Sequence, residues 1–222
     1  MGTSLTNGPP VGTAIRRDIR LDRASLDRDR HVCALFTSEE EQYALLMPFI
    51  RDGLEAGERS VQILDPERLD MHLARLSAAG VDVASALASG SLEVLTWPEA
   101  YAREDRFDQD AMLELIQDVL DRGRPSYPLT RLVANMEWAL TDLPGVADIV
   151  EYESRLNEVL VDYADPVICT YDLGRFSAGI VVDMLRTHPV AVVGGQLHQN
   201  PFYVTPAVLR EELRGRRELR QA

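Results

Sequence analysis

The sequence contains no lysine, only two cysteines and no long apolar run. All 23 basic residues of the 222-residue chain are arginines. Cys33 and Cys169 are too few for a disulfide framework, so we expect reduced thiols in a reducing compartment. No apolar run approaches the about 18 residues that a membrane-spanning helix needs, and residues 1–30 contain no apolar segment typical of a signal peptide. These absences predict a cytoplasmic protein that does not enter a membrane.

The charge is strongly negative and unevenly distributed. The formal net charge is −13. Residues 31–205 hold 12 arginines and 29 acidic residues, whereas residues 16–30 and 206–222 each carry a net charge of +2. Contacts with nucleic acid or anionic lipid need clustered cations. We therefore expect neither as a direct partner, and the charges of the arginine-rich ends alternate in sign as on a solvated helix face.

From residue 31 onward, short apolar runs alternate with longer amphipathic stretches. The predicted strands are 31–36, 60–64, 91–96, 131–138, 166–171 and 190–193, with helices in every interval between them. Such alternation predicts an α/β fold, a mostly parallel sheet with helices on both faces. We divide the chain into a flexible charged tail (1–28), one domain (29–205) and a C-terminal helix or tail (206–222).

Ligands of an open parallel sheet gather outside the carboxyl ends of its strands. The turn after the first strand, 37–41, reads Thr-Ser-Glu-Glu-Glu, with Ser38 and Glu41 at the spacing of a helix cap. It lacks the glycines and the lysine of a Walker A loop, and glutamates such as Glu40 repel an anion there. We therefore expect no nucleotide hydrolysis, and a neutral or cationic ligand or a protein partner.

Two groups of side chains are candidates for a site. His31 and Cys33 share one face of the first strand, and Cys169 joins them if the first and fifth strands are neighbours. These three side chains would then suit a soft metal or a cofactor; alternatively, both cysteines are small buried hydrophobes. Glu153 and Asn157 lie one helical turn apart, where they can orient a ligand, act in acid–base chemistry or serve the structure alone.

Several motifs occur in order along residues 29–205. They are His31-Val-Cys-Ala-Leu-Phe36 with Ser38-Glu-Glu-Glu-Gln-Tyr43, the segment 48–57, Tyr101 with Arg106-Phe-Asp108, Met136-Glu-Trp138, Glu151-Tyr-Glu153 with Asn157, Cys169-Thr-Tyr-Asp172 with Phe176, Arg186-Thr-His-Pro189, and Asn200-Pro-Phe-Tyr203. Together they resemble the MEDS domain, the methanogen/methylotroph sensory domain. The resemblance implies a RecA/KaiC-like fold without a working P-loop, and a sensory, non-catalytic role in recognising small hydrocarbon derivatives.

We accordingly predict a stand-alone signal-transduction sensor. Its ligand would bind at the carboxyl edge of the sheet and its signal would pass to a regulatory protein such as a kinase, an anti-sigma factor or a transcription regulator. The predicted ligand-binding residues are His31, Cys33, Glu40, Tyr43, Glu137, Trp138, Glu153, Asn157, Cys169 and Tyr171. Among them, Tyr43, Trp138 and Tyr171 would form apolar walls, and Glu137, Glu153 and His31 would orient the ligand.

Two other functions stay open at this point. One is a protein-interaction module with a vestigial pocket in an anti-sigma or kinase pathway. The other is a Cys- or Glu-dependent enzyme, which no Ser-His-Asp elbow, HExxH or CxxC motif supports. Haem, flavin or a corrinoid stay open as cofactors, with His31, Cys33 and His188 the residues to test if the protein is coloured. A homodimer is compatible with the sequence.

Overall fold

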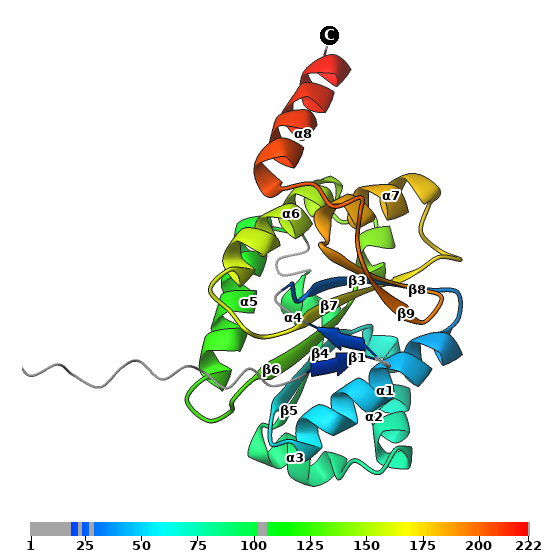
Figure 1. Ribbon diagram of the computed structural model, residues 1–222, viewed down its shortest axis with the longest axis vertical. Coiled ribbons are helices and arrows are strands. Elements are labelled where there is room, and N and C mark those ends of the chain that lie inside the picture. Colours follow the sequence, from blue (N-terminus) through cyan, green and yellow to red (C-terminus); the bar gives the residue numbers. More distant parts are fainter. Residues whose placement is uncertain (1–18, 22–23, 27–28, 102–105, 222) are drawn as a thin grey trace, which may run out of the picture.

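A seven-stranded sheet forms the centre of the molecule in the computed structural model, which describes residues 19–21, 24–26, 29–101 and 106–221 (Figure 1). The strand order is β5-β4-β6-β7-β3-β8-β9, and every pair is parallel except β8 with β9. The strands are β3 (His31–Phe36), β4 (Arg59–Leu64), β5 (Leu92–Thr96), β6 (Thr130–Asn135), β7 (Val167–Asp172), β8 (Val190–Val193) and β9 (Gln196–Gln199). The prediction of a mostly parallel α/β sheet is confirmed.

Helices cover both faces of this sheet (Figure 1). They are α1 (Glu39–Glu55), α2 (Leu69–Ala78), α3 (Val83–Ser89), α4 (Trp97–Ala100), α5 (Gln109–Gly123), α6 (Ile149–Leu160), α7 (Ala178–Thr187) and α8 (Pro206–Gln221), with short 3-10 turns at Pro66–Arg68, Glu137–Leu140 and Val146–Asp148. Residues of α1, α2 and α3 pack into one apolar core, and residues of α5, α6 and α7 into a second core on the opposite face. Alternate residues of each central strand therefore face different cores.

The start of α1 follows the predicted cap with one change. Ser38 Oγ accepts a hydrogen bond from the backbone N–H of Glu41 at 3.1 Å. The Glu41 carboxylate reaches back to Thr37 rather than to Ser38, and accepts from its backbone N–H at 2.8 Å and its hydroxyl at 2.7 Å. These hydrogen bonds lower the pKa of Glu41, so a carboxylate stays ionised in the turn where a P-loop protein holds phosphate.

A two-stranded hairpin precedes the sheet, formed by β1 (Ile19–Leu21) and β2 (Ala24–Leu26). Ile19, Leu21 and Leu26 are buried in the core on the α1 side. The prediction of a flexible tail is therefore wrong for these two strands, because Ile19 and Leu21 have the period-two spacing of a strand within an arginine-rich segment. Residues 1–18 of that predicted tail lie outside the described residues, whereas the predicted C-terminal helix is present as α8.

Two further differences have local causes. Strand β6 ends at Asn135 instead of Trp138, because the backbone at Met136 turns into the 3-10 segment that follows it. Strand β9 was not predicted. Gly194 and Gly195, with φ angles of 57° and 73°, form the two-residue turn that pairs it antiparallel with β8.

Candidate functional site

The predicted site residues lie on both faces of the sheet and do not form one pocket. Strands β3 and β7 are neighbours, with Cys33 opposite Cys169, so the conditional expectation about these strands is confirmed. His31, Cys33, Cys169 and Tyr171 all lie on the face that α6 covers. Tyr43 lies on α1, across the sheet, and contacts α2. The prediction of a single pocket with walls from Tyr43, Trp138 and Tyr171 is therefore wrong, because Tyr43 is on α1 whereas Trp138 and Tyr171 belong to the core on the opposite face.

One pocket does lie at the carboxyl ends of β4 and β6, between α1 and α2; we call it the α1–α2 pocket. The space open to a water-sized molecule is about 30 Å³, within about 440 Å³ of empty space that includes solvent at the mouth. It is lined by Gln42, Tyr43, Leu46, Ile50, Gln62, Ile63, Leu64, Arg68, His72, Val133 and Asn135. Among the predicted site residues, Tyr43 lines it. The combination of aliphatic walls with a few polar groups is typical of small-molecule sites.

His72 is the central polar group of the α1–α2 pocket. Its Nδ1 lies 2.9 Å from the Tyr43 hydroxyl, and its Nε2 has no hydrogen-bond partner in the described part of the chain. Burial lowers the pKa of His72 to about 4, so the imidazole is neutral near pH 7. The Arg75 guanidinium lies 4.3 Å from the centre of the Tyr43 ring, which holds the ring in place. The pocket thus presents an uncharged donor or acceptor beside a fixed aromatic ring.

Replacing His72 with glutamine is expected to reduce the acid sensitivity of the fold. The folded-state pKa of about 4 lies below the ordinary 6.5, so the unfolded state binds more protons between these pH values. The stability that neutral His72 contributes is present above pH 6.5 and is lost as the pH falls towards 4. We expect the variant to lose about 3 kcal/mol less than the wild type over this range, at about 1.4 kcal/mol per pKa unit. Urea unfolding at several pH values measures this difference.

The exposed His198 supplies the control for this measurement. His198→Gln should keep the wild-type pH dependence, because this side chain is exposed on β9 and folding does not bury it. Equal pH slopes for His72→Gln and the wild type would contradict the assignment of a buried neutral imidazole.

The edge of the sheet next to this pocket carries the buried carboxylate of Glu137, which is 3% exposed. It pairs with Arg175 and lies 3.8 Å from Arg68. Arg68 also lines the α1–α2 pocket, so Glu137 orients a pocket residue without lining the pocket itself.

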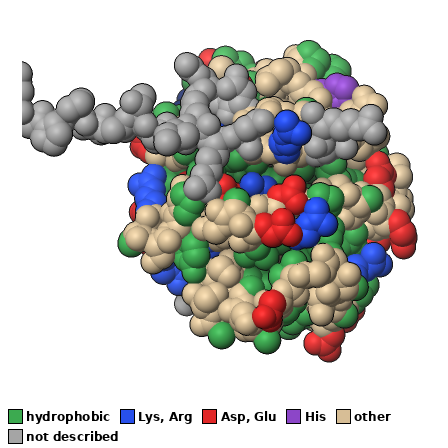
Figure 2. All heavy atoms as spheres, turned by 60° about the horizontal axis from the view of Figure 1, so that its bottom comes forward, with side chains coloured by type: hydrophobic (Ala, Val, Ile, Leu, Met, Phe, Trp, Pro, Cys, Tyr) green, Lys and Arg blue, Asp and Glu red, His purple; other side chains and the backbone are tan. Residues whose placement is uncertain are grey.

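Glu40 is exposed in the first turn of α1. On the face shown in Figure 2, acidic and arginine side chains are interspersed.

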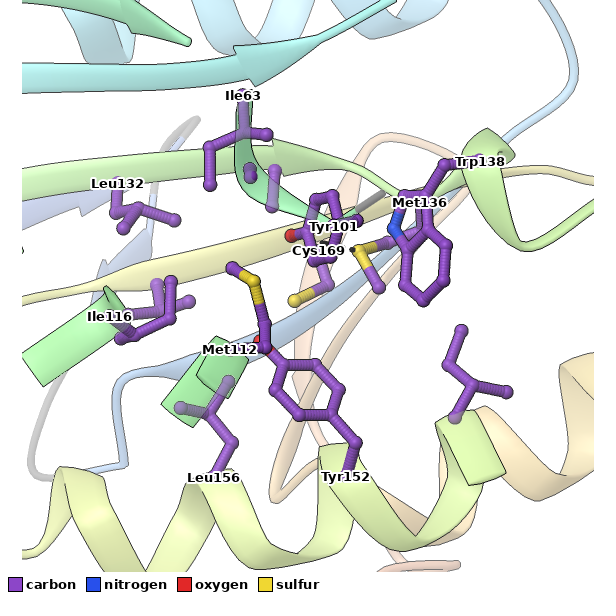
Figure 3. Packing of buried hydrophobic residues seen from close by; sticks show 14 of the residues in the cluster. Ile63, Tyr101, Met112, Ile116, Leu132, Met136, Trp138, Tyr152, Leu156 and Cys169 are labelled. Atoms are coloured by element: carbon purple, nitrogen blue, oxygen red, sulfur yellow. Dashed lines mark hydrogen bonds between the residues drawn. The ribbon is translucent and has the colours of Figure 1, made fainter. Parts of the chain in front are cut away.

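Trp138 lies inside the described part of the protein and is absent from the lining of the α1–α2 pocket. Its side chain is 0% exposed and stacks on Tyr101 with 4.4 Å between ring centres (Figure 3). Phe107 packs against the same indole at 4.6 Å. The prediction of Trp138 as a ligand-binding wall is wrong, since the turn after β6 directs the indole into the α5–α6 core.

On the face of the sheet that α6 covers lies a compact cluster that we call the buried tetrad. Its members are His31, Glu153, Cys169 and His188. His31 begins β3, Glu153 is on α6, Cys169 is in β7, and His188 directly follows α7. One ligand-type atom from each residue lies within 4.8 Å of the other three. All four side chains are buried, with exposures of 2% or less. His31 begins β3, as predicted, so the tetrad lies away from the carboxyl edge at which the predicted ligand would bind.

The remaining predicted residues surround the tetrad. The Tyr171 hydroxyl donates to Glu153 Oε1 at 3.0 Å, and Asn157 Oδ1 lies 3.1 Å from His31 Nδ1. Burial, followed by the charge of Glu153, raises the pKa of the Cys33 and Cys169 thiols well above their usual value. Burial lowers the pKa of His188 to about 3. The cluster therefore combines the neutral imidazole of His188 and the Cys169 thiol with the Glu153 carboxylate and the His31 ring.

Sequence reasoning placed three members of the tetrad among the site residues but considered His188 only as a test for colour. The residue lies in the Arg-Thr-His-Pro motif, 35 positions after Glu153, and only the packing of α7 against α6 brings the two together. The sequence did contain a signal that could have identified His72 as a buried polar residue. It lies three residues after Leu69 and four before Leu76, on the apolar face of its helix.

The fold first defines a class of protein. The sheet and its helices are similar to those of a KaiC-like protein, PH0186, from Pyrococcus horikoshii OT3, with a TM-score of 0.56, 20% identity, and coverage of 73% of this chain and 70% of that one. This likeness confirms a RecA/KaiC-like α/β fold. In the described part of the chain, every helix is too short or too polar to cross a bilayer.

The profile of the MEDS family (MEthanogen/methylotroph, DcmR Sensory domain) matches residues 30–189. The chain belongs to this family of sensory domains, as its motifs predicted. A curated relative, the transcriptional repressor DcmR of Methylorubrum extorquens, is 29% identical over 161 residues, which are 71% of this chain. The chain spans only 57% of the length of that repressor.

Proposed function

We propose that this protein is a non-catalytic sensor that binds a small uncharged molecule in the α1–α2 pocket and passes the signal to a regulatory partner. The observation that carries the proposal is the pocket itself, where aliphatic walls meet the neutral imidazole of His72 and the hydroxyl of Tyr43. Membership in a family of sensory domains and likeness to a transcriptional repressor support the regulatory role.

The chemistry of the potential nucleophiles supports a non-catalytic protein. The thiolate is the reactive form of cysteine, and burial raises the pKa of both thiols in this chain. The turn after β3 supports a ligand other than a nucleotide, because the backbone N–H of Thr37 is already bonded to the Glu41 carboxylate.

A continuous set of contacts supports signal transfer across the sheet. Below the pocket, Gln42 donates to the Thr170 hydroxyl of β7 at 3.3 Å. The next residue of β7, Tyr171, donates to Glu153 of α6 at 3.0 Å. A ligand that shifts α1 therefore acts on α6 through one strand, provided that the two arrangements of these contacts differ in ligand affinity.

The C-terminal helix is the surface from which a partner would read α6. Helix α8 packs against α6 through the buried Leu209, and Arg210 and Arg217 pair with Glu158 and Glu151 of α6 at 2.7 and 2.5 Å. Its far end projects from the body of the protein (Figure 1), where Leu219 is 81% exposed. The same helix favours the second candidate, a module that binds its partner without any ligand.

Thermal unfolding with a panel of short-chain alcohols, ketones, amides and halogenated hydrocarbons tests the sensor. A binding compound at 100 times its Kd stabilises the fold by about 2.7 kcal/mol. Tyr43→Phe should weaken binding of a hydrogen-bonding compound about fivefold, since one hydrogen bond contributes about 1 kcal/mol. Tyr127→Phe, which alters a tyrosine that bonds Ser89 away from the pocket, should leave binding unchanged.

Two results would overturn the sensor. One is the absence of stabilisation by every compound, together with native mass spectra showing no bound molecule in the protein as purified. The other is equal binding by Tyr43→Phe and the wild type. Capture of a regulatory protein that depends on α8 but not on any compound would instead favour the interaction module.

A further inference from the structure

We propose that His31, Glu153, Cys169 and His188 form a binding site for a divalent transition-metal ion, with Zn²⁺ as the best match. This site is separate from the α1–α2 pocket and lies on the other face of the sheet. Its donor set of two imidazoles, one carboxylate and one thiolate is typical of zinc and unlike the all-oxygen sites of Mg²⁺ or Ca²⁺.

The spacing of the four donor atoms fits a tetrahedral ion. Glu153 Oε2 lies 3.2 Å from His31 Nε2 and 3.5 Å from His188 Nε2. Cys169 Sγ lies 3.6 Å from His31 Nε2 and 3.7 Å from Glu153 Oε2. Zinc bond lengths at tetrahedral angles place N and O ligands about 3.3 Å apart, and S about 3.6 Å from either. The two remaining distances, from His188 to His31 and to Cys169, are no longer than 4.8 Å, so an adjustment of the His188 side chain would centre an ion.

Hydrogen bonds determine the tautomer of His31. The Asn157 amide nitrogen donates to the carbonyl of Thr187 at 2.6 Å and to that of Glu153 at 3.1 Å. Its oxygen therefore faces His31 Nδ1, which must carry the hydrogen of that 3.1 Å bond. The other ring nitrogen, Nε2, faces the Glu153 carboxylate at 3.2 Å. Orientation of a ligand histidine by such an outer bond is a regular feature of metal sites.

His188 is oriented in the same way. Its Nδ1 lies 2.8 Å from the carbonyl oxygen of Met184, which can only accept, so the hydrogen is on Nδ1. Its Nε2 is buried without a hydrogen-bond partner among the described residues, yet it lies 3.5 Å from Glu153 Oε2. The Nε2 atoms of two histidines and a carboxylate oxygen thus meet at one point inside the protein, and a cation between them would pair with all three.

The charges around the site balance when zinc is bound. Tyr171 holds Glu153 Oε1 and leaves Oε2 for the ion. On binding, the Cys169 thiol releases its proton to solvent, and its sulfur forms the bond to the metal. One thiolate and one carboxylate then neutralise Zn²⁺, so the buried site carries no net charge. Four protein ligands leave no open position, which is typical of structural or regulatory zinc rather than catalytic zinc.

A surface pocket provides a route for the ion. The space open to a water-sized molecule is about 160 Å³, and His31 and Asn157 are among its lining residues. Asp29 and Asp165 line it beside a single arginine, Arg30, so acidic side chains outnumber basic ones there. His31 lines this pocket and also contacts Glu153. An ion that enters the pocket therefore meets His31 before the other three members of the tetrad.

Cobalt and zinc binding by the full chain test the proposal. After treatment with a chelator, the protein should take up one equivalent of Co²⁺ and show tetrahedral absorption with a thiolate charge-transfer band. Zinc should then displace cobalt stoichiometrically and raise the unfolding temperature.

Cys169→Ser should lose the charge-transfer band and bind zinc far more weakly. Cys33→Ser, which changes the other buried cysteine of the same face, should keep both the band and the zinc affinity. Asn157→Ala should weaken zinc binding roughly 10–100-fold, as expected for loss of an outer-shell partner.

Three outcomes would overturn the proposal. They are less than stoichiometric metal in the wild type, a cobalt spectrum without the thiolate band, or unchanged zinc affinity in Cys169→Ser. Because a ligand variant can fail to fold, Glu153→Gln serves as a second test, since its amide can still accept from Tyr171. A folded Glu153→Gln protein with wild-type zinc affinity would show that a proton, not a metal, joins the two histidines to the carboxylate.

Discussion

Replacing Trp138 with alanine is expected to lower the free energy of unfolding by about 3–5 kcal/mol. The indole is completely buried and lies against Tyr101 and Phe107, so its removal leaves a cavity between rigid rings. Equilibrium unfolding in urea measures the loss, provided that the slope with denaturant stays constant.

Trp138→Phe separates packing from hydrogen bonding. The indole Nε1 has no hydrogen-bond partner among the described residues, so phenylalanine forfeits only part of the packing. We expect this variant to lose less than half of the alanine effect. Equal losses in the two variants would show that the indole nitrogen has a partner. A near-neutral Trp138→Ala would restore the residue as a candidate wall of a ligand cavity.

Arg131→Ala is expected to destabilise the protein by about 3–5 kcal/mol, because it removes the cation from a buried ion pair. Arg131 Nε lies 2.5 Å from the Glu58 carboxylate, and Nη1 donates to the Phe49 carbonyl at 2.7 Å. The side chains of Arg131 and Glu58 are 6% and 1% exposed. Gly53 makes room for the pair, since a Cβ there would come within 2.6 Å of Arg131.

The exposed pair of Arg51 and Asp52 is the matched control for this loss. Arg51→Ala should change the free energy of unfolding by less than about 1 kcal/mol, as is usual for solvated ion pairs. The double variant Arg131→Met with Glu58→Leu should recover much of the stability lost in Arg131→Ala, because it removes both buried charges. Failure of the double variant to exceed the single one would show that packing around the arginine, not charge, determines the loss.

The parts of the fold predicted correctly depend on short stretches of sequence. The buried run 31–36 and the cap at Ser38 carry their own signals in periodicity and residue type. The register of β3 with β7 depends on the whole sheet, so the meeting of Cys33 with Cys169 was only conditional. The backbone turns at Met136, where the sequence predicted a continuing strand. This turn directs Trp138, a predicted site residue, into the core.

The candidate sites were less predictable because they depend on the relation between elements. The α1–α2 pocket needs two helices side by side over β4 and β6, which no local pattern specifies. The buried tetrad collects residues from four elements, and its last member, His188, depends on where α7 ends. Local sequence did place Glu153 and Asn157 on one helix face, and Asn157 donates to the Glu153 carbonyl at 3.1 Å.

The amino-terminal hairpin affects how this sensory unit can be transplanted. The family match begins at residue 30, yet Ile19, Leu21 and Leu26 pack into the same apolar core as Leu45 of α1. A fusion protein that begins at residue 30 would leave that side of α1 facing water and prone to self-association. A functional chimaera with a different output domain therefore needs the hairpin carried along as part of the sensor.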